Sequence, residues 1–450
     1  MGKFTKLIQV YDKLGNINVL DVPHYDVFKN YKYPQLFYSG MGEEFVEKQE
    51  FDKINFDLNS ETLYCYVLEP FGAFDNFLGK TNHNNEKGVF YKLSNKVLDT
   101  LRNKENFFLI IDSKHEGGWY DDYLIQIKLQ LRELKIPINK LILLATHNWY
   151  VKSKDLNITE RFTFEVPFNV VSFPTFILHK SQEMLKLNQY NNLDLKAYLS
   201  DKREYKFLNY NHRILKRQRI GLLFLMFKDN MFTDNLISFN FDFLEEKEQV
   251  KNLKYLDIAS PDYEPLRNLI SEDEWNIHFP KLLELNKNIV DSENPEELSG
   301  FGYEFPETYK KSYVSIVNES FFYERDDIRV VTEKSFKPFT HFHPFIVVGS
   351  PGTLSELKKW GFKTFDKWWD ESYDDEIDNG TRFTKCYELI KKINNMSLDE
   401  LHTMYLEMIP TLMHNFNLMK EYGKNIKDNY NLYYDKEILR EVNENNKKYN

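Results

Sequence analysis

Apolar runs alternate with amphipathic helical stretches along this chain, and the series occurs twice. In the first half, the pattern predicts strands at residues 64–68, 107–112, 140–145 and 170–173, with a helix at 123–134. In the second half, it predicts strands at 313–317, 328–331, 345–348 and 363–365, and helices at 220–227, 353–360 and 382–393. Continuous apolar strands separated by helices are typical of parallel sheets covered on both faces. The pattern therefore predicts an α/β protein with two Rossmann-like domains.

The length of 450 residues also favours two domains over one. The stretch at residues 195–206 is charged and irregular, and it is the predicted interdomain linker. We expect an N-terminal domain at 1–205 and a C-terminal domain at 206–395, facing each other across a cleft. The chain is helical in pattern from Ser397 onward, so residues 396–450 are predicted to form a C-terminal helical segment.

Charge and cysteine content exclude several classes of protein. The net charge of −10 argues against a broad cationic surface for nucleic-acid phosphates. Cys65 and Cys386 are the two cysteines, and no CxxC is present, so neither a disulfide framework nor a cysteine zinc site is predicted. Residues 1–11 lack the apolar core of a signal peptide, and the apolar run at 221–227 is too short to span a bilayer. We expect a cytoplasmic protein with no membrane span.

Polar residues follow one predicted strand and begin the next predicted helix. Asn318-Glu319-Ser320 comes after the strand at 313–317, at the edge of a parallel sheet where ligands bind. Thr332-Glu333-Lys334 then begins a helix, with Thr332 as its N-cap. Free N–H groups at a helix start favour a phosphate, Lys334 adds a cationic charge, and the carboxylate of Glu333 can accept two ribose hydroxyls. The alternative interpretation is that this tripeptide is only a capped helix start.

Two further segments are predicted to contact the same ligand. Gly349-Ser350-Pro351-Gly352 is a tight turn after the strand at 345–348, and Gly349 and Ser350 are expected to offer a second set of N–H donors. A basic segment precedes the helix at 220–227, and within it Arg219 is the first candidate for binding a diphosphate and Arg213 the second. A guanidinium donates two parallel hydrogen bonds to phosphate oxygens. The alternative is a solvated basic face.

Asn318-Glu319-Ser320, Thr332-Glu333-Lys334 and the strand at 344–349 resemble the donor-site signature of the α1,3-fucosyltransferases. The resemblance covers about residues 313–352 and extends elsewhere only to architecture. Residues 334–338 and 362–366 are also similar to glycosyltransferase-like proteins of large phages. The fucosyltransferases have the two-domain GT-B fold and use GDP-fucose. The resemblance implies that Glu333 binds the nucleotide ribose, that Lys334 binds the diphosphate, and that an arginine before the helix clamps it.

The candidate catalytic carboxylates lie in the first domain. The strand at 107–112 ends in Asp112 and runs into an acidic loop that contains Glu116 and glycine. An inverting transferase needs one carboxylate to deprotonate the acceptor hydroxyl. Glu116 is the first candidate for this base, and Asp112 is the second. The alternative is that this acidic loop only caps a helix.

These residues predict a glycosyltransferase that moves a sugar, with inversion, from a nucleotide diphosphate sugar to an acceptor hydroxyl. No Asp-x-Asp follows a strand end, so we expect lysine and arginine to neutralise the donor phosphates, with neither a metal nor a further cofactor. A glycan or small molecule is the expected acceptor. One alternative is a phage-type enzyme that modifies a hydroxymethylated DNA base in the host cytoplasm. Another is a non-catalytic protein that binds a nucleotide or nucleic acid in the same cleft.

Overall fold

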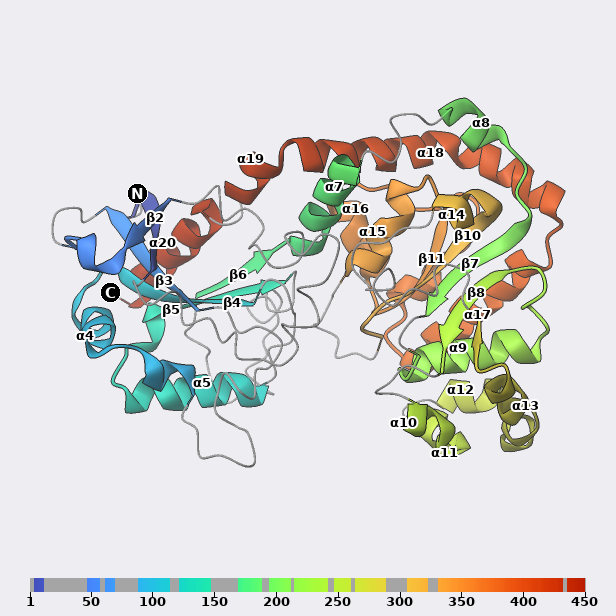
Figure 1. Ribbon diagram of the computed structural model, residues 1–450, viewed down its shortest axis with the longest axis horizontal. Coiled ribbons are helices and arrows are strands. Elements are labelled where there is room, and N and C mark those ends of the chain that lie inside the picture. Colours follow the sequence, from blue (N-terminus) through green and yellow to red (C-terminus); the bar gives the residue numbers. More distant parts are fainter. Residues whose placement is uncertain are drawn as a thin grey trace. The chain divides into compact units, whose positions relative to one another are not determined.

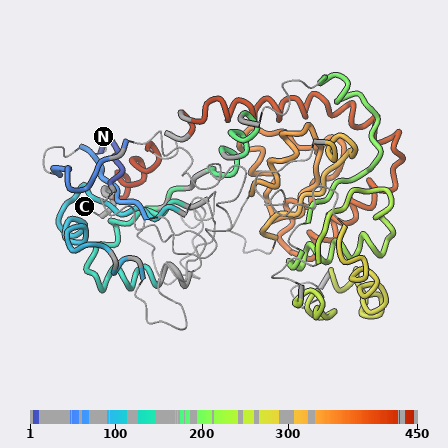
Figure 2. The backbone as a smooth tube through the Cα atoms, viewed as in Figure 1, coloured from blue at the N-terminus to red at the C-terminus, as the bar shows by residue number. Residues whose placement is uncertain are grey.

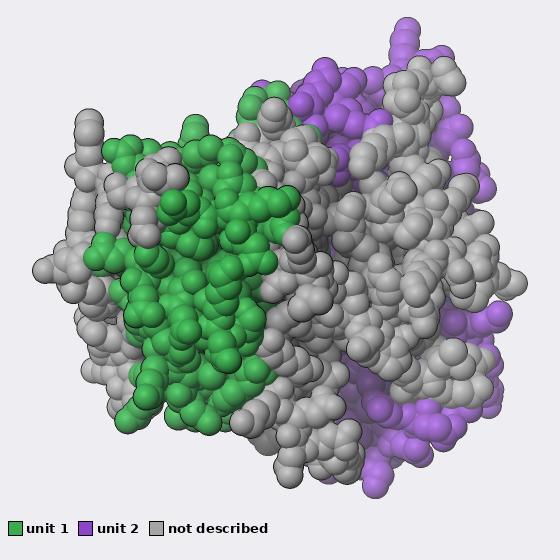
Figure 3. All heavy atoms as spheres, turned by 60° about the vertical axis from the view of Figure 1, so that its left-hand side comes forward, with its two compact units in different colours: residues 1–178, 425–450 green, residues 179–424 purple. Residues whose placement is uncertain are grey.

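The computed structural model describes the chain in thirteen stretches: residues 4–11, 47–56, 61–68, 88–113, 121–146, 169–187, 194–211, 214–241, 247–259, 264–288, 306–322, 331–431 and 435–449. The chain divides into two compact units (Figure 3). Unit 1 comprises residues 1–178 and 425–450, and unit 2 comprises residues 179–424. The chain thus passes from unit 1 into unit 2 and back, as Figure 2 traces. The sequence had placed this division at 205/206 and treated 396–450 as one separate segment.

Unit 1 is built on a six-stranded parallel sheet with the order β2-β1-β3-β4-β5-β6 (Figure 1). The strands are β1 (Lys6–Tyr11), β2 (Lys48–Glu50), β3 (Thr62–Leu68), β4 (Phe107–Ser113), β5 (Leu141–Thr146) and β6 (Asn169–Phe173). The helices are α4 (Asn95–Asn103), α5 (Asp121–Glu133), α19 (Ile426–Asn431) and α20 (Glu437–Tyr449), with short 3₁₀ turns at Phe51–Lys53, Val89–Lys92 and Ile138–Lys140. Helix α7 (Thr175–Leu187) crosses the boundary between the units. The four strands and the helix predicted in this half are confirmed.

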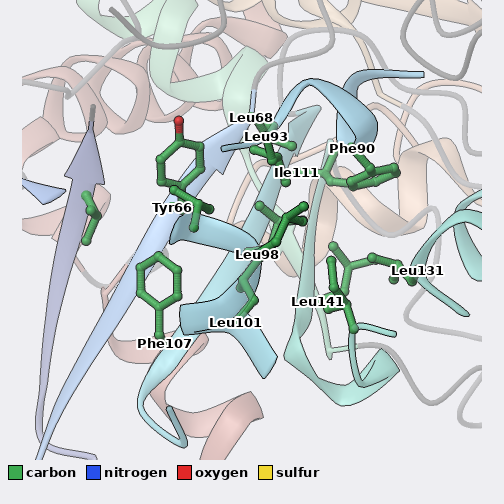
Figure 4. Close-up of a cluster of buried hydrophobic side chains, with 14 of the residues drawn as sticks. Tyr66, Leu68, Phe90, Leu93, Leu98, Leu101, Phe107, Ile111, Leu131 and Leu141 are labelled. Atoms are coloured by element: carbon green, nitrogen blue, oxygen red, sulfur yellow. The ribbon is translucent and has the colours of Figure 1, made fainter. Parts of the chain in front are cut away.

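The core of unit 1 explains why its strands read as continuous apolar runs. Phe107 and Ile111 of β4 belong to one buried cluster with Leu101 of α4 and Leu131 of α5 (Figure 4). Successive side chains of a strand point to opposite faces, so Phe108, the residue after Phe107, faces the other side of the sheet. It is also buried. Both faces of the strand are therefore covered. Burying each of these side chains contributes about 1.5–3 kcal/mol to the free energy of unfolding.

The C-terminal helix α20 packs on the sheet of unit 1. The Asn443 side chain accepts a hydrogen bond from the Phe4 amide at 3.0 Å and donates to the Phe4 carbonyl at 2.9 Å. Asn445 donates to the side chain of Asn169, the first residue of β6, at 2.7 Å. Asn443 thus binds the backbone just before β1, and Asn445 binds the first residue of β6, the last strand of this sheet along the chain. Residues 425–450 therefore belong to unit 1.

Asp435, just before α20, is predicted to make unit 1 less stable at neutral pH. Burial, with a smaller effect of the Glu47 carboxylate, raises the pKa of Asp435 to about 6. The proton therefore binds more tightly in the folded state, and stability falls as pH rises from the unfolded pKa, about 4, through about 6. Discounted for its partial exposure, the Asp435→Asn change should raise the free energy of unfolding by about 1 kcal/mol at neutral pH.

Chemical denaturation of the two proteins across this pH range measures the effect. The gain from Asp435→Asn should shrink as the pH falls from about 6 and disappear below about pH 3, where the wild-type carboxyl is protonated in both states. A gain of equal size at acidic and neutral pH would contradict the assignment.

Unit 2 has a five-stranded sheet with the order β11-β10-β7-β8-β9, parallel except for β9. Its strands are β7 (Tyr205–Asn211), β8 (Leu236–Asn240), β9 (Lys287–Asn288), β10 (Ser312–Asn318) and β11 (Phe345–Val348). Its helices are α8 (Leu195–Ser200), α9 (Arg217–Lys228), α10 (Lys247–Lys251), α11 (Tyr255–Ile258), α12 (Glu264–Leu269), α13 (Glu272–Glu284), α14 (Pro306–Lys311), α15 (Glu333–Thr340), α16 (Thr353–Lys359), α17 (Asn379–Asn394) and α18 (Leu398–Lys424), with a 3₁₀ turn at Ser372–Asp375. With two parallel α/β sheets, the predicted fold class is confirmed.

Two predictions for this half are wrong. The stretch at 195–206 is not an irregular linker, since it forms α8 and the first residues of β7. Residues 363–365 form no strand, because side chains occupy the backbone N–H and C=O groups that would otherwise pair with a neighbouring strand. The Asn415 amide accepts from the Lys363 N–H and donates to its carbonyl, each at 2.8 Å, and Glu371 accepts from the Phe365 N–H at 2.7 Å. Most of the strand predicted at 328–331 lies outside the described residues, and Val331 is not in a strand.

The strand order of unit 2 reverses beside β7. From β7 the chain moves through α9 to β8 on one side, while β10 pairs with β7 on the other side. The carboxyl ends of β7 and β10 therefore flank a topological switch point, which is where ligands bind in open α/β sheets. Within the described stretches, no helix is both long and apolar enough to cross a membrane.

Candidate functional site

Glu319, directly after β10, ties the end of this strand to the start of α15. One carboxylate oxygen accepts from the Thr332 N–H at 3.0 Å and the Ser335 hydroxyl at 2.6 Å. The other accepts from the Ser320 N–H at 3.1 Å and the Thr332 hydroxyl at 2.6 Å. Glu319 is fully buried. Its carboxylate therefore sets where α15 begins, and the predicted contact between Glu319 and a donor would have to compete with these bonds.

Glu333 and Lys334 form an ion pair in the first turn of α15. Burial would raise the pKa of the Glu333 carboxyl, but Lys334, and more weakly Lys337, hold that pKa below its ordinary value. The Glu333 side chain is 4% exposed, whereas that of Lys334 is 30% exposed. The Thr332 hydroxyl also lies 3.4 Å from both the backbone nitrogen and Nζ of Lys334. The ammonium group of Lys334 is thus the part of this pair that an incoming anion can reach.

The first turn of α9 contacts the same strand end from the side of β7. Nη2 of Arg219 donates to the carbonyls of Asn318 at 3.2 Å and Glu319 at 3.4 Å. Lys216, the N-cap residue of α9, donates to the Ser320 carbonyl, and its Nζ lies 5.2 Å from the centre of the Phe321 ring. Arg219 therefore lies against the Asn318-Glu319-Ser320 segment, and the prediction that both bind a donor stays a prediction. Arg213 lies outside the described residues.

A row of asparagine amides runs across the ends of β7 and β10. Asn209 donates from Nδ2 to the Ile316 carbonyl at 2.8 Å, and its Oδ1 accepts from Asn211. Asn318 donates from Nδ2 to Oδ1 of Asn211 at 2.8 Å. All three asparagines are buried. The sequence analysis proposed only Asn318, yet asparagine is rare inside strands, so its repetition two residues apart in β7 was a usable signal.

The glycine turn before α16 leads into a helix start that is already capped, and the donor role predicted for Gly349 and Ser350 stays a prediction. The Asp374 carboxylate accepts from the N–H groups of Leu354 at 2.9 Å and Ser355 at 3.1 Å, so it already caps this helix. The Ser350 hydroxyl donates to the Phe321 carbonyl at 3.3 Å, and the residue is buried. Gly349 is needed for close packing, since a Cβ there would lie 3.2 Å from Cβ of Glu319. The turn therefore packs against the residues that follow β10.

Arg382 of α17 is a supporting residue that the sequence analysis missed. Its guanidinium donates to the carbonyls of Gly349 at 3.0 Å, Glu376 at 2.8 Å and Ile377 at 3.1 Å, and also to the Phe322 carbonyl. The guanidinium carbon lies 4.5 Å from the centre of the Phe322 ring, and Arg382 is fully buried. This side chain joins the loops that follow β10 and β11. An arginine within an otherwise apolar helical stripe was its only mark in the sequence.

The predicted catalytic carboxylates belong to unit 1. Asp112 is the second-last residue of β4 and is buried. Its backbone is paired with that of Leu144 in β5. Glu116 lies outside the described residues. Among the residues that the structure describes, no group of three or more His, Cys, Asp or Glu side chains could hold a metal ion. The roles of Asp112 and Glu116 stay predictions.

No protein-family model matches the chain, and no curated protein is similar to it in sequence. Among solved structures, the S. aureus MnaA–UDP co-structure is 9% identical with a TM-score of 0.32, over 95% of this chain and 98% of that one. A putative UDP-N-acetylglucosamine 2-epimerase from Listeria monocytogenes is 7% identical with a TM-score of 0.33, over 97% and 98%. UDP-GlcNAc 2-epimerase from Neisseria meningitidis, bound to UDP-GlcNAc, is 11% identical with a TM-score of 0.26, over 91% and 100%. Similarity this low carries no argument about function, which must come from the residues of the site.

Proposed function

We propose that the protein binds a nucleotide diphosphate sugar at the carboxyl ends of β7 and β10 and transfers its sugar to an acceptor hydroxyl. The main observation is that the starts of α9 and α15, which both carry basic residues, are bonded to the same strand end, that of β10. Arg219 contacts the carbonyls of that strand end, and Lys334 reaches it through Thr332 and Glu319. The strand order also reverses at this edge of the sheet.

The charges at this edge suit a diphosphate. The exposed residues Lys216 and Arg217 begin α9, and no acidic residue lies in its first turn, so the helix dipole and the side chains favour an anion together. Lys334 presents its ammonium group from the start of α15. On diphosphate binding, Lys334 would donate a further N–H to a phosphate oxygen while it keeps its contact with Glu333. The Glu333 carboxylate, kept ionised by its low pKa, could then accept hydrogen bonds from ribose hydroxyls.

In the proposed reaction the acceptor oxygen attacks the anomeric carbon of the sugar. A bond forms between these two atoms while the bond from the anomeric carbon to the phosphate oxygen breaks, and the nucleotide diphosphate leaves with the electron pair. Cationic groups at the start of α9 and α15 stabilise the negative charge that develops on the leaving oxygen. A carboxylate takes the proton from the acceptor hydroxyl, with Glu116 as the first candidate for this base and Asp112 as the second.

A thermal-shift screen with UDP, GDP, ADP and CMP, and with their sugar derivatives, tests the binding step. One nucleotide should raise the melting temperature in a concentration-dependent way, because a ligand that binds only the folded state stabilises it by mass action. The absence of stabilisation by every nucleotide would sink the proposal. With the responsive sugar nucleotide, Glu116→Gln should stop both transfer and slow hydrolysis. Hydrolysis that survives this change would show that another group is the base, and binding without any turnover would favour a non-catalytic binding protein.

A further inference from the structure

Two buried amide oxygens beside the proposed diphosphate site have no hydrogen-bond partner within the described stretches. They are Oδ1 of Asn318, at the end of β10, and Oε1 of Gln218, in the first turn of α9. Asn318 is 3% exposed and Gln218 is fully buried. An unsatisfied buried acceptor costs about 1–3 kcal/mol, and native structures keep few of them. Two such oxygens at one strand end point to hydrogen-bond donors that come from a ligand.

The orientation of the Asn318 amide is fixed by its neighbours. The Ile316 carbonyl can only accept, so the NH₂ group of Asn209 must face it. Oδ1 of Asn209 then accepts from Asn211, and Oδ1 of Asn211 accepts from Asn318. Turning the Asn318 amide over would place its oxygen against the oxygen of Asn211. These hydrogen bonds therefore fix the Asn318 amide with its Nδ2 toward Asn211 and its acceptor oxygen, Oδ1, pointing away from Asn211.

The same reasoning fixes Gln218. Its Nε2 lies 3.4 Å from the Glu319 carbonyl, which can only accept, so its Oε1 points elsewhere as an acceptor. The Glu319 carbonyl also accepts from Arg219. Both free oxygens thus belong to side chains that are attached to the Asn318-Glu319 strand end.

We propose that Asn318 Oδ1 and Gln218 Oε1 bind hydroxyl groups of the sugar, next to the cations that hold the diphosphate. The inference rests on the proposed function and adds a sugar subsite to it. A fully ionised diphosphate offers only acceptor oxygens, so it cannot satisfy these two amides, whereas a sugar hydroxyl can donate. Asn209 and Asn211 are positioning residues, since they set the direction of the Asn318 amide without touching the sugar.

The test compares dissociation constants for UDP with UDP-glucose and for GDP with GDP-mannose, measured by isothermal titration calorimetry. Asn318→Ala should weaken binding of the responsive sugar nucleotide about tenfold and binding of its free diphosphate less than about twofold, because one hydrogen bond to the sugar is lost. Gln218→Met, which keeps the side-chain volume, should give the same selective loss. Asn211→Leu should reproduce it in part, because the Asn318 amide is then free to turn.

Asn288→Ala is the matched control. Asn288 donates to the Ile237 carbonyl at 2.6 Å on the edge strand β9, at the other side of the sheet, so its loss should leave both constants unchanged. Equal weakening of the diphosphate and the sugar nucleotide by Asn318→Ala and Gln218→Met would overturn the sugar subsite alone. A change in melting temperature with no change in either constant would also overturn it, since a buried water would then be the partner. Failure of the wild-type protein to bind any nucleotide or sugar nucleotide of the thermal-shift screen would reject the proposed function and the subsite together.

Discussion

Lys334→Ala should weaken binding of the responsive nucleotide diphosphate by about 10-fold to 100-fold, as expected for the loss of a hydrogen bond between charged groups. In the ligand-free protein the ammonium group contacts the Glu333 carboxylate and the Thr332 hydroxyl, and it remains partly exposed. It is therefore the cation of α15 that can turn to a phosphate at the start of the helix. Isothermal titration calorimetry with the diphosphate measures the loss.

Lys337→Ala is the matched control for this change. Lys337 lies in the last turn of α15, so its removal alters the same net charge without touching the start of the helix. It should change the dissociation constant by less than about twofold, because Lys337 lies one turn beyond the helix start and acts on Glu333 more weakly than Lys334 does. The melting temperature of ligand-free Lys334→Ala must also be measured, since the change leaves the buried Glu333 carboxylate without its partner cation. Equal effects of Lys334→Ala and Lys337→Ala on affinity would mean that only net charge matters and that Lys334 has no specific contact.

Glu319→Gln should be the most destabilising single-atom change at the site, lowering the free energy of unfolding by about 3 kcal/mol. Each carboxylate oxygen faces a backbone N–H, of Thr332 on one side and Ser320 on the other. A hydroxyl can rotate to become an acceptor, but a backbone N–H cannot. Whichever way the new amide turns, its NH₂ group therefore meets a backbone donor. For a unit of this size the melting temperature should fall by about 8 °C.

Ser335→Ala provides the graded comparison, because it removes one hydroxyl donor and leaves the carboxylate with its other partners. It should cost about 1 kcal/mol, as for one lost hydrogen bond. If Glu319→Gln were no more harmful than Ser335→Ala, the carboxylate would not be holding the start of α15. Nucleotide affinity should also fall in Glu319→Gln, since Thr332 and Lys334 lose the support that places them.

The strands that could be predicted were those whose residues are buried on both faces. Residues 107–111 and 345–348 are apolar throughout, and their burial in a parallel sheet follows from that alone. Strand β7 was missed because its sequence mixes tyrosine, lysine and asparagine, which sequence patterns read as loop. Its place in the sheet depends on tertiary pairing with β10 and β8, which no local pattern encodes.

The site could be predicted to the extent that its residues are close together along the chain. Thr332 caps α15 as the sequence indicated, and Arg219 lies against the predicted strand end. The protein partners of Glu319 were not predictable, since its carboxylate accepts hydrogen bonds from Thr332 and Ser335, which lie 13 and 16 residues further along the chain. The cap of α16 was not predictable for the same reason. A helix start binds a phosphate only if no side chain caps it first, and the capping Asp374 lies twenty residues away.

The central claim is that a nucleotide binds at the carboxyl ends of β7 and β10. Hydrogen–deuterium exchange of the wild-type protein, with and without the responsive nucleotide diphosphate, tests where it binds. The claim predicts slower exchange in peptides that cover residues 214–222 and 331–337, because their amides would lie against the phosphates and ribose. Peptides from β8 and β9, at the opposite side of the sheet, should exchange as before. Protection confined to unit 1, or absent from both helix starts, would contradict the claim.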